Sequence, residues 1–129
     1  RLEKHQENSL KVFEYLETKK VVKEIYFLPD KKNIYHKLWK KYFKLSNGLI
    51  TFSVAKMNKI ESFIDQLNFF KIGFSWGGYE SLILPLNNLK PTKKLRTNNK
   101  YWFSIHVGLE DINDLKKDLK NAMEIYEAQ

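Results

Sequence analysis

The sequence contains no cysteine and no apolar run that approaches the length of a membrane span. Without cysteine the chain has no thiolate nucleophile, no cysteine-ligated zinc and no disulfide, although a secreted protein can also lack cysteine. The opening stretch, Arg1 to Gln6, lacks the apolar segment of a signal peptide. We therefore expect a soluble chain that makes no membrane contact, with a cytoplasmic location as the default.

Length and composition predict one globular domain. The chain has 129 residues, and 43% of them are hydrophobic, which supplies enough apolar surface for a single packed core. It begins at Arg1 without an initiator methionine, and its first residues already have the pattern of a helix. We therefore expect residues 1–129 to be one domain of a longer protein.

The net charge of +8 raises the question of nucleic-acid binding. The lysines are scattered through most of the chain, and the densest stretches are Lys31-Lys32, Lys37 to Lys44 and Lys90 to Arg96, which lie beside Asn or Pro. This distribution favours lysines on a solvated surface. No nucleic-acid partner is expected, and a basic nucleic-acid-binding module stays as a minor alternative.

Hydrophobic periodicity predicts alternating helices and strands. Helices are expected over residues 2–18 and about 34–43, after Asn58 and after Asp111, and strands over 21–27, 49–55, 70–74 and 101–107. Asn58 is suited to cap the third helix, and Asp111 opens the fourth. This order predicts an α+β fold in which helices pack on one face of a mostly antiparallel sheet of about four strands.

Several kinds of site lack their sequence patterns. The three histidines, His5, His36 and His106, fall on separate elements without the close spacing of metal ligands. Gly77-Gly78 lacks the further glycines and the Lys-Ser/Thr pair of a phosphate-binding loop, and Ser75 has no Gly-x-Ser-x-Gly surroundings. Metal, nucleotide and hydrolase sites are therefore not predicted.

One segment, residues 74–81, is a polar loop that is expected to leave a strand. Its two adjacent glycines allow backbone conformations that other residues avoid and let a ligand approach the main chain closely. A tight turn with a packed tryptophan fits the same residues. The spacing alone leaves both interpretations open.

The sequence Ser-Trp-Gly-Gly-Tyr-Glu-Ser at residues 75–81 resembles the Ser-x-Gly-Gly-x-Glu-Ser segment of the Cys/Met-metabolism enzymes that use pyridoxal phosphate (PLP). Its Trp-Gly-Gly-Tyr form is similar to that of bacterial cystathionine beta-lyases. The stretch from His106 to Asp111, with Asp114-Leu115 after it, resembles the closing strand and helix of the same family. The resemblance covers essentially the whole chain.

This resemblance implies the small C-terminal domain of a PLP-dependent transferase-like fold (fold type I), which closes the substrate pocket of a large PLP-binding domain absent from this chain. The implied reaction is the α,β-elimination of cystathionine to homocysteine, pyruvate and ammonia, a transsulfuration step in methionine biosynthesis, with PLP as electron sink. Ser75 would lie near the cofactor and its lysine. The Trp76 backbone N–H would help to hold the carboxylate of the amino-acid substrate.

The Schiff-base lysine of this family lies in a Ser-x-Thr-Lys context, which none of the lysines here has. The chain is therefore expected to hold no catalytic residue, to bind no PLP by itself and to be inactive alone. PLP is expected in the full-length protein, which would be a PLP-dependent carbon–sulfur lyase and a homo-oligomer.

Relatives in this family usually have an arginine two residues before the His-x-Gly motif, and this chain has Ser104 there. Strand alternation places Ser104 on the same face as Trp102 and His106, so we expect it to face the substrate pocket. Serine offers one neutral donor where arginine offers a charged fork. Each lost hydrogen bond to a charged group removes roughly 1.5–3 kcal/mol of binding.

Three hypotheses follow for the protein that contains this domain. It is a working carbon–sulfur lyase with altered substrate handling, a degraded or regulatory relative that has lost catalysis, or a basic binding module.

Overall fold

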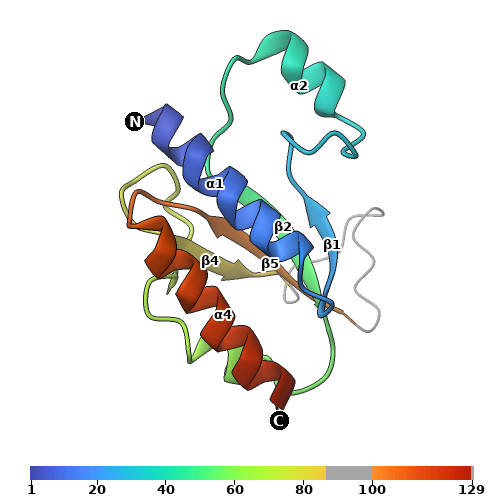
Figure 1. Ribbon diagram of the computed structural model, residues 1–129, viewed down its shortest axis with the longest axis vertical. Coiled ribbons are helices and arrows are strands. Elements are labelled where there is room, and N and C mark those ends of the chain that lie inside the picture. The colour runs from blue at the N-terminus through green and yellow to red at the C-terminus, as the bar shows by residue number, and fades with distance from the viewer. Residues whose placement is uncertain (87–99, 129) are drawn as a thin grey trace.

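The computed structural model describes residues 1–86 and 100–128. The helices are α1 (Leu2–Glu17), α2 (His36–Tyr42), α3 (Glu61–Ile64) and α4 (Ile112–Ala128), and the strands are β1 (Val22–Tyr26), β2 (Leu49–Ala55), β3 (Lys71–Ile72), β4 (Leu82–Pro85) and β5 (Lys100–His106). The strands form one sheet in the order β1-β2-β5-β4-β3, in which β3 and β4 are parallel and the other neighbours antiparallel (Figure 1). This confirms the predicted α+β class with a mostly antiparallel sheet.

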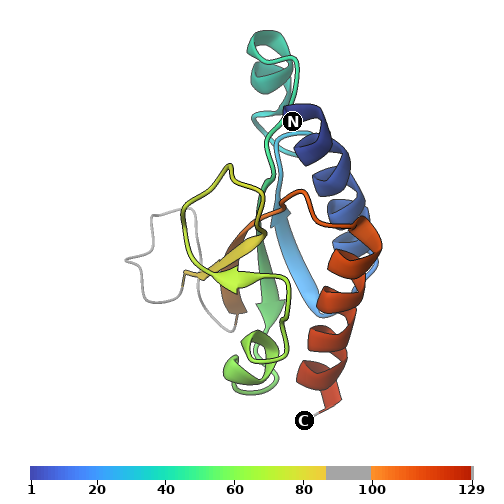
Figure 2. The ribbon, with the colours of Figure 1, turned by 90° about the vertical axis from the view of Figure 1, so that its left-hand side faces the viewer.

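The two long helices cover one face of the sheet, as predicted (Figure 2). Both are amphipathic: α1 buries Val12 and Leu16, and α4 buries Leu115 and Leu119. They pack on the apolar residues of the central strands, which include Ile50, Phe52, Val54, Phe103 and Ile105. Full burial of each such side chain stabilises the fold by about 1.5–3 kcal/mol, so this layer is the core.

Three local features differ from the sequence prediction. The sheet has five strands where about four were predicted. The additional strand is β4, a run of only four residues that was not predicted from the sequence. The strand expected over residues 70–74 is shortened to Lys71–Ile72. The prediction that Asn58 caps the third helix was wrong, because the N-cap position is Ile60 and the Asn58 amide donates to the backbone oxygen of Tyr126 instead.

The other face of the sheet positions the candidate site. On β5, Trp102, Ser104 and His106 point to this face, and their partners on β2 are Ser53, Thr51 and Leu49. Figure 2 shows the loop between β3 and β4 on this side, opposite the two long helices.

Helix α2 stands away from the rest of the domain (Figures 1 and 2). None of the other described helices and strands packs against it. No helix among residues 1–86 and 100–128 is long and apolar enough to cross a membrane. Of the three lysine-rich stretches, Lys90 to Arg96 lies outside the described residues.

Candidate functional site

The candidate site begins with the glycine-containing loop over residues 73–81. Gly73 N–H donates to Ile83 O at 3.1 Å, and Lys71 N–H donates to Ser81 O at 3.2 Å, which ties the two ends of the loop together. At its tip Gly77 has a φ of +96°, a conformation that L side chains rarely adopt. The backbone conformation at residue 77 therefore requires glycine.

A carboxylate joins this loop to the segment after β5. Glu110 accepts from Ser81 at both carboxylate oxygens, at 2.8 Å from the hydroxyl and 2.9 Å from the backbone N–H. The Ser81 hydroxyl in turn accepts from Gly108 N–H at 2.8 Å, and Leu109 N–H donates to Tyr79 O at 2.8 Å. The two motifs that carried the family resemblance therefore hold each other in place.

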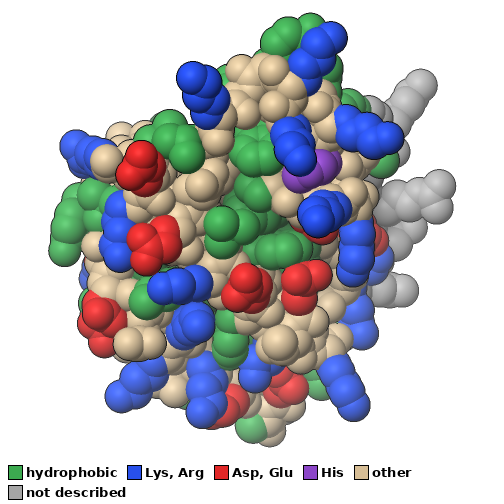
Figure 3. All heavy atoms as spheres, turned by 45° about the horizontal axis from the view of Figure 1, so that its top comes forward, with side chains coloured by type: hydrophobic (Ala, Val, Ile, Leu, Met, Phe, Trp, Pro, Cys, Tyr) green, Lys and Arg blue, Asp and Glu red, His purple; other side chains and the backbone are tan. Residues whose placement is uncertain are grey.

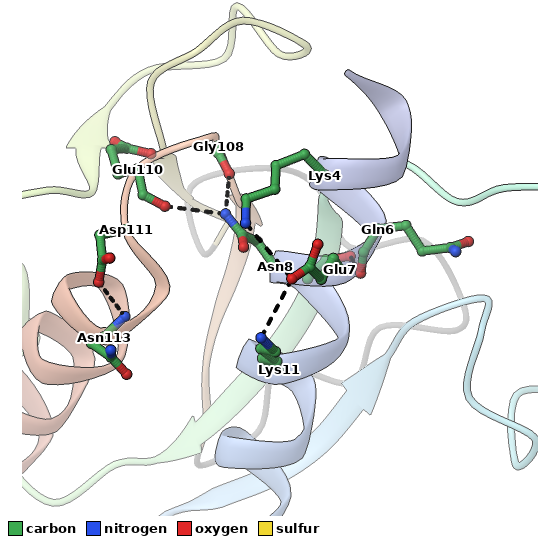
Figure 4. A network of polar contacts seen from close by, with 10 residues as sticks. Lys4, Gln6, Glu7, Asn8, Lys11, Gly108, Glu110, Asp111 and Asn113 are labelled. Carbon is green, nitrogen blue, oxygen red and sulfur yellow. Dashed lines mark hydrogen bonds and ion pairs between the residues drawn. The ribbon is translucent and has the colours of Figure 1, made fainter.

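Helix α1 contributes to the same network. The Asn8 side-chain amide donates to Gly108 O at 3.0 Å and to Glu110 O at 3.1 Å (Figure 4). Asn8 is fully buried. Asn8, Ser81 and Glu110 were not predicted as supporting residues. For Asn8 the available signal was a polar side chain on the buried face of a helix, since a buried amide needs partners.

A large groove is lined by residues of α1, β1, β2 and the segment around α2, including Tyr26 and Thr51, and its lining also includes Trp76 and Ser104. Its volume is about 1560 Å³. Ser104 is 8% exposed, and its hydroxyl lies 3.5 Å from the Thr51 hydroxyl, at the long limit of a hydrogen bond. Figure 3 shows hydrophobic side chains gathered in a hollow, with basic and acidic side chains around it.

The structure places the other predicted site residue apart from this groove. Ser75 is exposed and is not part of the groove lining formed by the described residues. The Trp76 N–H, which was expected to hold a substrate carboxylate, donates to Phe74 O at 3.0 Å. A carboxylate would have to replace this contact. The substrate roles of Ser75, Trp76 and Ser104 and the cofactor role of Ser75 stay predictions.

Charges of both signs line the groove. The acidic residues are Glu17, Glu24 and Asp30, and the basic residues are Lys23 and Lys32. Among the residues that the structure describes, no arginine lines the groove. Burial, with Glu24 close by, raises the pKa of Tyr26 above its usual 10.0.

The described residues do not form a PLP site by themselves. A PLP enzyme needs a lysine amine for the Schiff base and donors for the phosphate. Lys32 is exposed and lies 3.8 Å from the Glu17 carboxylate, and Lys23 is exposed on the groove rim. Neither of these two lysines lies in an enclosed setting. Within the described part of the chain no group of three or more His, Cys, Asp or Glu could hold a metal ion.

The sheet order and the one-sided helical layer define a class of protein domain. They match the corresponding part of cystathionine gamma synthase from Xanthomonas oryzae pv. oryzae with a TM-score of 0.85 and 26% identity, over 99% of this chain and 35% of that one. The domain therefore has the fold of the C-terminal domain of fold-type I PLP enzymes.

Within that class the family is defined by sequence. Residues 1–124 match the family described as "Cys/Met metabolism PLP-dependent enzyme", so the chain belongs to this family. It is 37% identical to cystathionine beta-lyase of Escherichia coli K12 over 92% of the chain and 32% of that protein. It is 34% identical to an L-alanine/L-glutamate racemase of Wolbachia pipientis over 95% of the chain and 32% of that protein. The chain thus spans about a third of the length of these relatives.

Proposed function

We propose that this chain is the C-terminal, pocket-closing domain of a PLP-dependent carbon–sulfur lyase that converts cystathionine to homocysteine, pyruvate and ammonia in methionine biosynthesis. The observation that carries this proposal is that Trp76, from the motif at residues 75–81, and Ser104 on β5 line the same groove. The 37% identity to the Escherichia coli lyase supports the choice of reaction. A racemase is 34% identical to the chain, which is nearly as similar as the lyase, so an experiment has to decide between the two reactions.

In this proposal the rest of the enzyme lies in a large PLP-binding domain outside this chain, and the chain alone is inactive. The groove of about 1560 Å³ supports this view, because pockets for small molecules measure roughly 300–1,000 Å³. The remaining volume would be filled by the large domain. The cytoplasmic location and the homo-oligomeric assembly stay predictions.

Ser104 favours the second hypothesis, a relative that keeps the fold without catalysis. The substrate carboxylate would meet a neutral hydroxyl there, and the cations that line the groove are Lys23 and Lys32. The nucleic-acid alternative is disfavoured by three acidic residues in the groove, which would repel phosphates. The nucleic-acid-binding alternative would be supported only by salt-dependent binding of the chain to a nucleic acid.

The test is a pyruvate assay on the full-length protein with PLP and cystathionine. We expect weak turnover that rises about tenfold or more in Ser104→Arg, because one charge-assisted hydrogen bond contributes roughly 1.5–3 kcal/mol. Asn113→Arg is the control, since it adds the same charge at an exposed position of α4 outside the groove lining and should not raise turnover. A Schiff-base absorption band without pyruvate in either the native protein or Ser104→Arg would contradict the lyase proposal and favour the non-catalytic relative.

A further inference from the structure

His106 lies where one ring nitrogen meets two backbone groups of the glycine loop. The residue is 1% exposed, and its Nε2 atom lies 3.3 Å from Gly77 N and 3.3 Å from Gly78 O. A bare Nε2 can accept from the Gly77 N–H but cannot bond the Gly78 carbonyl, and a protonated Nε2 does the reverse. The proton on this atom therefore decides which residue of the loop is held.

A second buried histidine, His5, lies beside His106 and influences which state is favoured. His5 Nδ1 lies 2.9 Å from Val107 O, and a carbonyl only accepts, so His5 carries its proton on Nδ1. Its Nε2 is then a bare acceptor in the neutral ring, and this atom is buried without a hydrogen-bond partner in the protein.

The two imidazoles face a common space. Their ring centroids are 5.0 Å apart, and both rings line a cavity of about 400 Å³. His106 Nδ1 is also buried without a protein partner. No hydrogen bond joins His106 Nδ1 to His5 Nε2, but a bare His106 Nδ1 would leave two unpartnered lone pairs in this cavity, which a proton on His106 Nδ1 avoids. The favoured tautomer of His106 therefore has a bare Nε2, which is the state that accepts from Gly77.

The charged and titratable groups around His106 act in opposite directions. Burial is the main cause that lowers the pKa of His106 below its usual 6.5, the hydrogen bond to the Gly78 carbonyl raises it, and His5 on α1 lowers it. Glu110, after β5, raises the pKa, and Arg1 lines the same cavity. The net result is a neutral ring at neutral pH.

We propose that His106 is a positioning residue: its bare Nε2 holds Gly77, and thereby the adjacent Trp76, at the edge of the groove, and protonation of the ring releases this amide. His5 supports this role because its bare Nε2 lies in the same cavity and disfavours a second bare nitrogen there. The proposal rests on the proposed function only in taking Trp76 as a substrate contact. Trp76 lines both the groove and the histidine cavity, so movement of the loop changes both.

The experiment is an NMR titration of the 129-residue chain labelled with carbonyl-¹³C tryptophan and ¹⁵N glycine. Trp76-Gly77 is the only Trp-Gly pair in the sequence, so a carbonyl-correlated spectrum isolates the Gly77 amide. On acidification we expect its proton resonance to move upfield as its hydrogen bond is lost, with a midpoint below 6.5. The Gly73 amide, bonded to Ile83 O, should stay fixed and reports any unfolding.

Two variants make the titration specific. His106→Gln keeps an acceptor that does not titrate, so the Gly77 resonance should lose its pH dependence. His36→Gln is the matched control, because that histidine bonds Leu28 O beside α2, and the titration should be unchanged. If His106→Gln unfolds, the ¹⁵N shift of His106 Nε2 in the native chain decides instead, and it should be that of a bare nitrogen at neutral pH.

A Gly77 resonance that does not move with pH in the native chain would overturn the proposal. Equal movement in His106→Gln, or a protonated Nε2 at neutral pH, would do the same. None of these measurements needs substrate or PLP, so a failed pyruvate assay would leave them unaffected, and a failed titration would leave the proposed function standing.

Discussion

Gly108 lies where two backbone segments come unusually close. A Cβ atom at this position would lie 2.2 Å from Tyr79 O and 2.8 Å from the carbonyl carbon of Glu80. Backbone atoms cannot move aside without disturbing the hydrogen bonds of the loop. Position 108 is therefore glycine for reasons of space, in contrast to Gly77, where the dihedral angle is the reason.

We predict that Gly108→Ala destabilises the chain by about 1–3 kcal/mol, the usual cost of forcing a methyl group into a packed region. Gly78→Ala is the control, because a Cβ atom there meets nothing within 4 Å. It should change stability by no more than about 0.5 kcal/mol. Denaturant unfolding of the three proteins measures the difference, and equal midpoints for the two variants would contradict the close contact.

At the same scale, the candidate site residues differ in how far their sequence explains them. Alternation along β5 correctly placed Ser104 with Trp102 and His106 on one face. The sequence of the glycine loop did not reveal that the Trp76 N–H donates to Phe74 O, because that contact depends on the local turn of the backbone.

Among the elements, α4 holds the segment between α3 and β3 through one buried carboxylate. Asp118 is 4% exposed and accepts backbone N–H groups of Asn68, Phe69 and Phe70 at 2.7, 2.9 and 3.2 Å. These three hydrogen bonds fix the backbone of residues 68–70 on α4, directly before the edge strand β3 begins. An acidic residue on the apolar face of α4, between Leu115 and Ala122, was the available signal in the sequence.

We predict that Asp118→Asn destabilises the domain by about 1.5–3 kcal/mol, since the amide keeps one acceptor and loses the charge and the second oxygen. Asp65→Asn removes the same charge at an exposed position and should have little effect. Thermal unfolding is the measurement. A loss in Asp65→Asn equal to that in Asp118→Asn would show that net charge, and not these three bonds, is responsible.

The length and periodicity of each helix and strand explain which of them were predicted correctly from the sequence. The long helices and central strands follow from sustained periodicity, and Asp111 caps α4 by accepting from Asn113 N–H at 2.8 Å. Strand β4 has four residues, too few for a period to be recognised. Asn58 failed as a cap because its amide is engaged by Tyr126 of α4, a partner 68 residues away.

For the whole molecule, the main feature is an apolar surface around α2. Leu38 is 56% exposed, and Tyr42 and Phe43 are 66% and 63% exposed. Lysines on the same helix flank these side chains. Contiguous exposed apolar side chains mark interaction surfaces, so this region fits the proposed contact with the large domain.

We predict that Leu38→Gln combined with Tyr42→Gln lowers the fluorescence of a bound apolar dye while the melting temperature of the chain changes by no more than about 2 °C, because exposed substitutions have little effect on stability. Ile72→Gln on β3, which removes a 67% exposed side chain at the far edge of the sheet, is the control and should leave dye binding unchanged. A large drop in melting temperature for the α2 pair would mean that α2 belongs to the core.

The sequence by itself determined the α+β class, the amphipathic helices, the family and the serine at position 104, because these depend on local periodicity and on short motifs. Only the tertiary structure decided which polar groups meet. His5 reaches Val107 across 102 residues, and Ser81 reaches Glu110 across 29. Such pairs depend on how the sheet and helices pack, and no local pattern encodes their distance. The hydrogen bonds that hold the glycine loop in place can therefore be found only in the folded molecule.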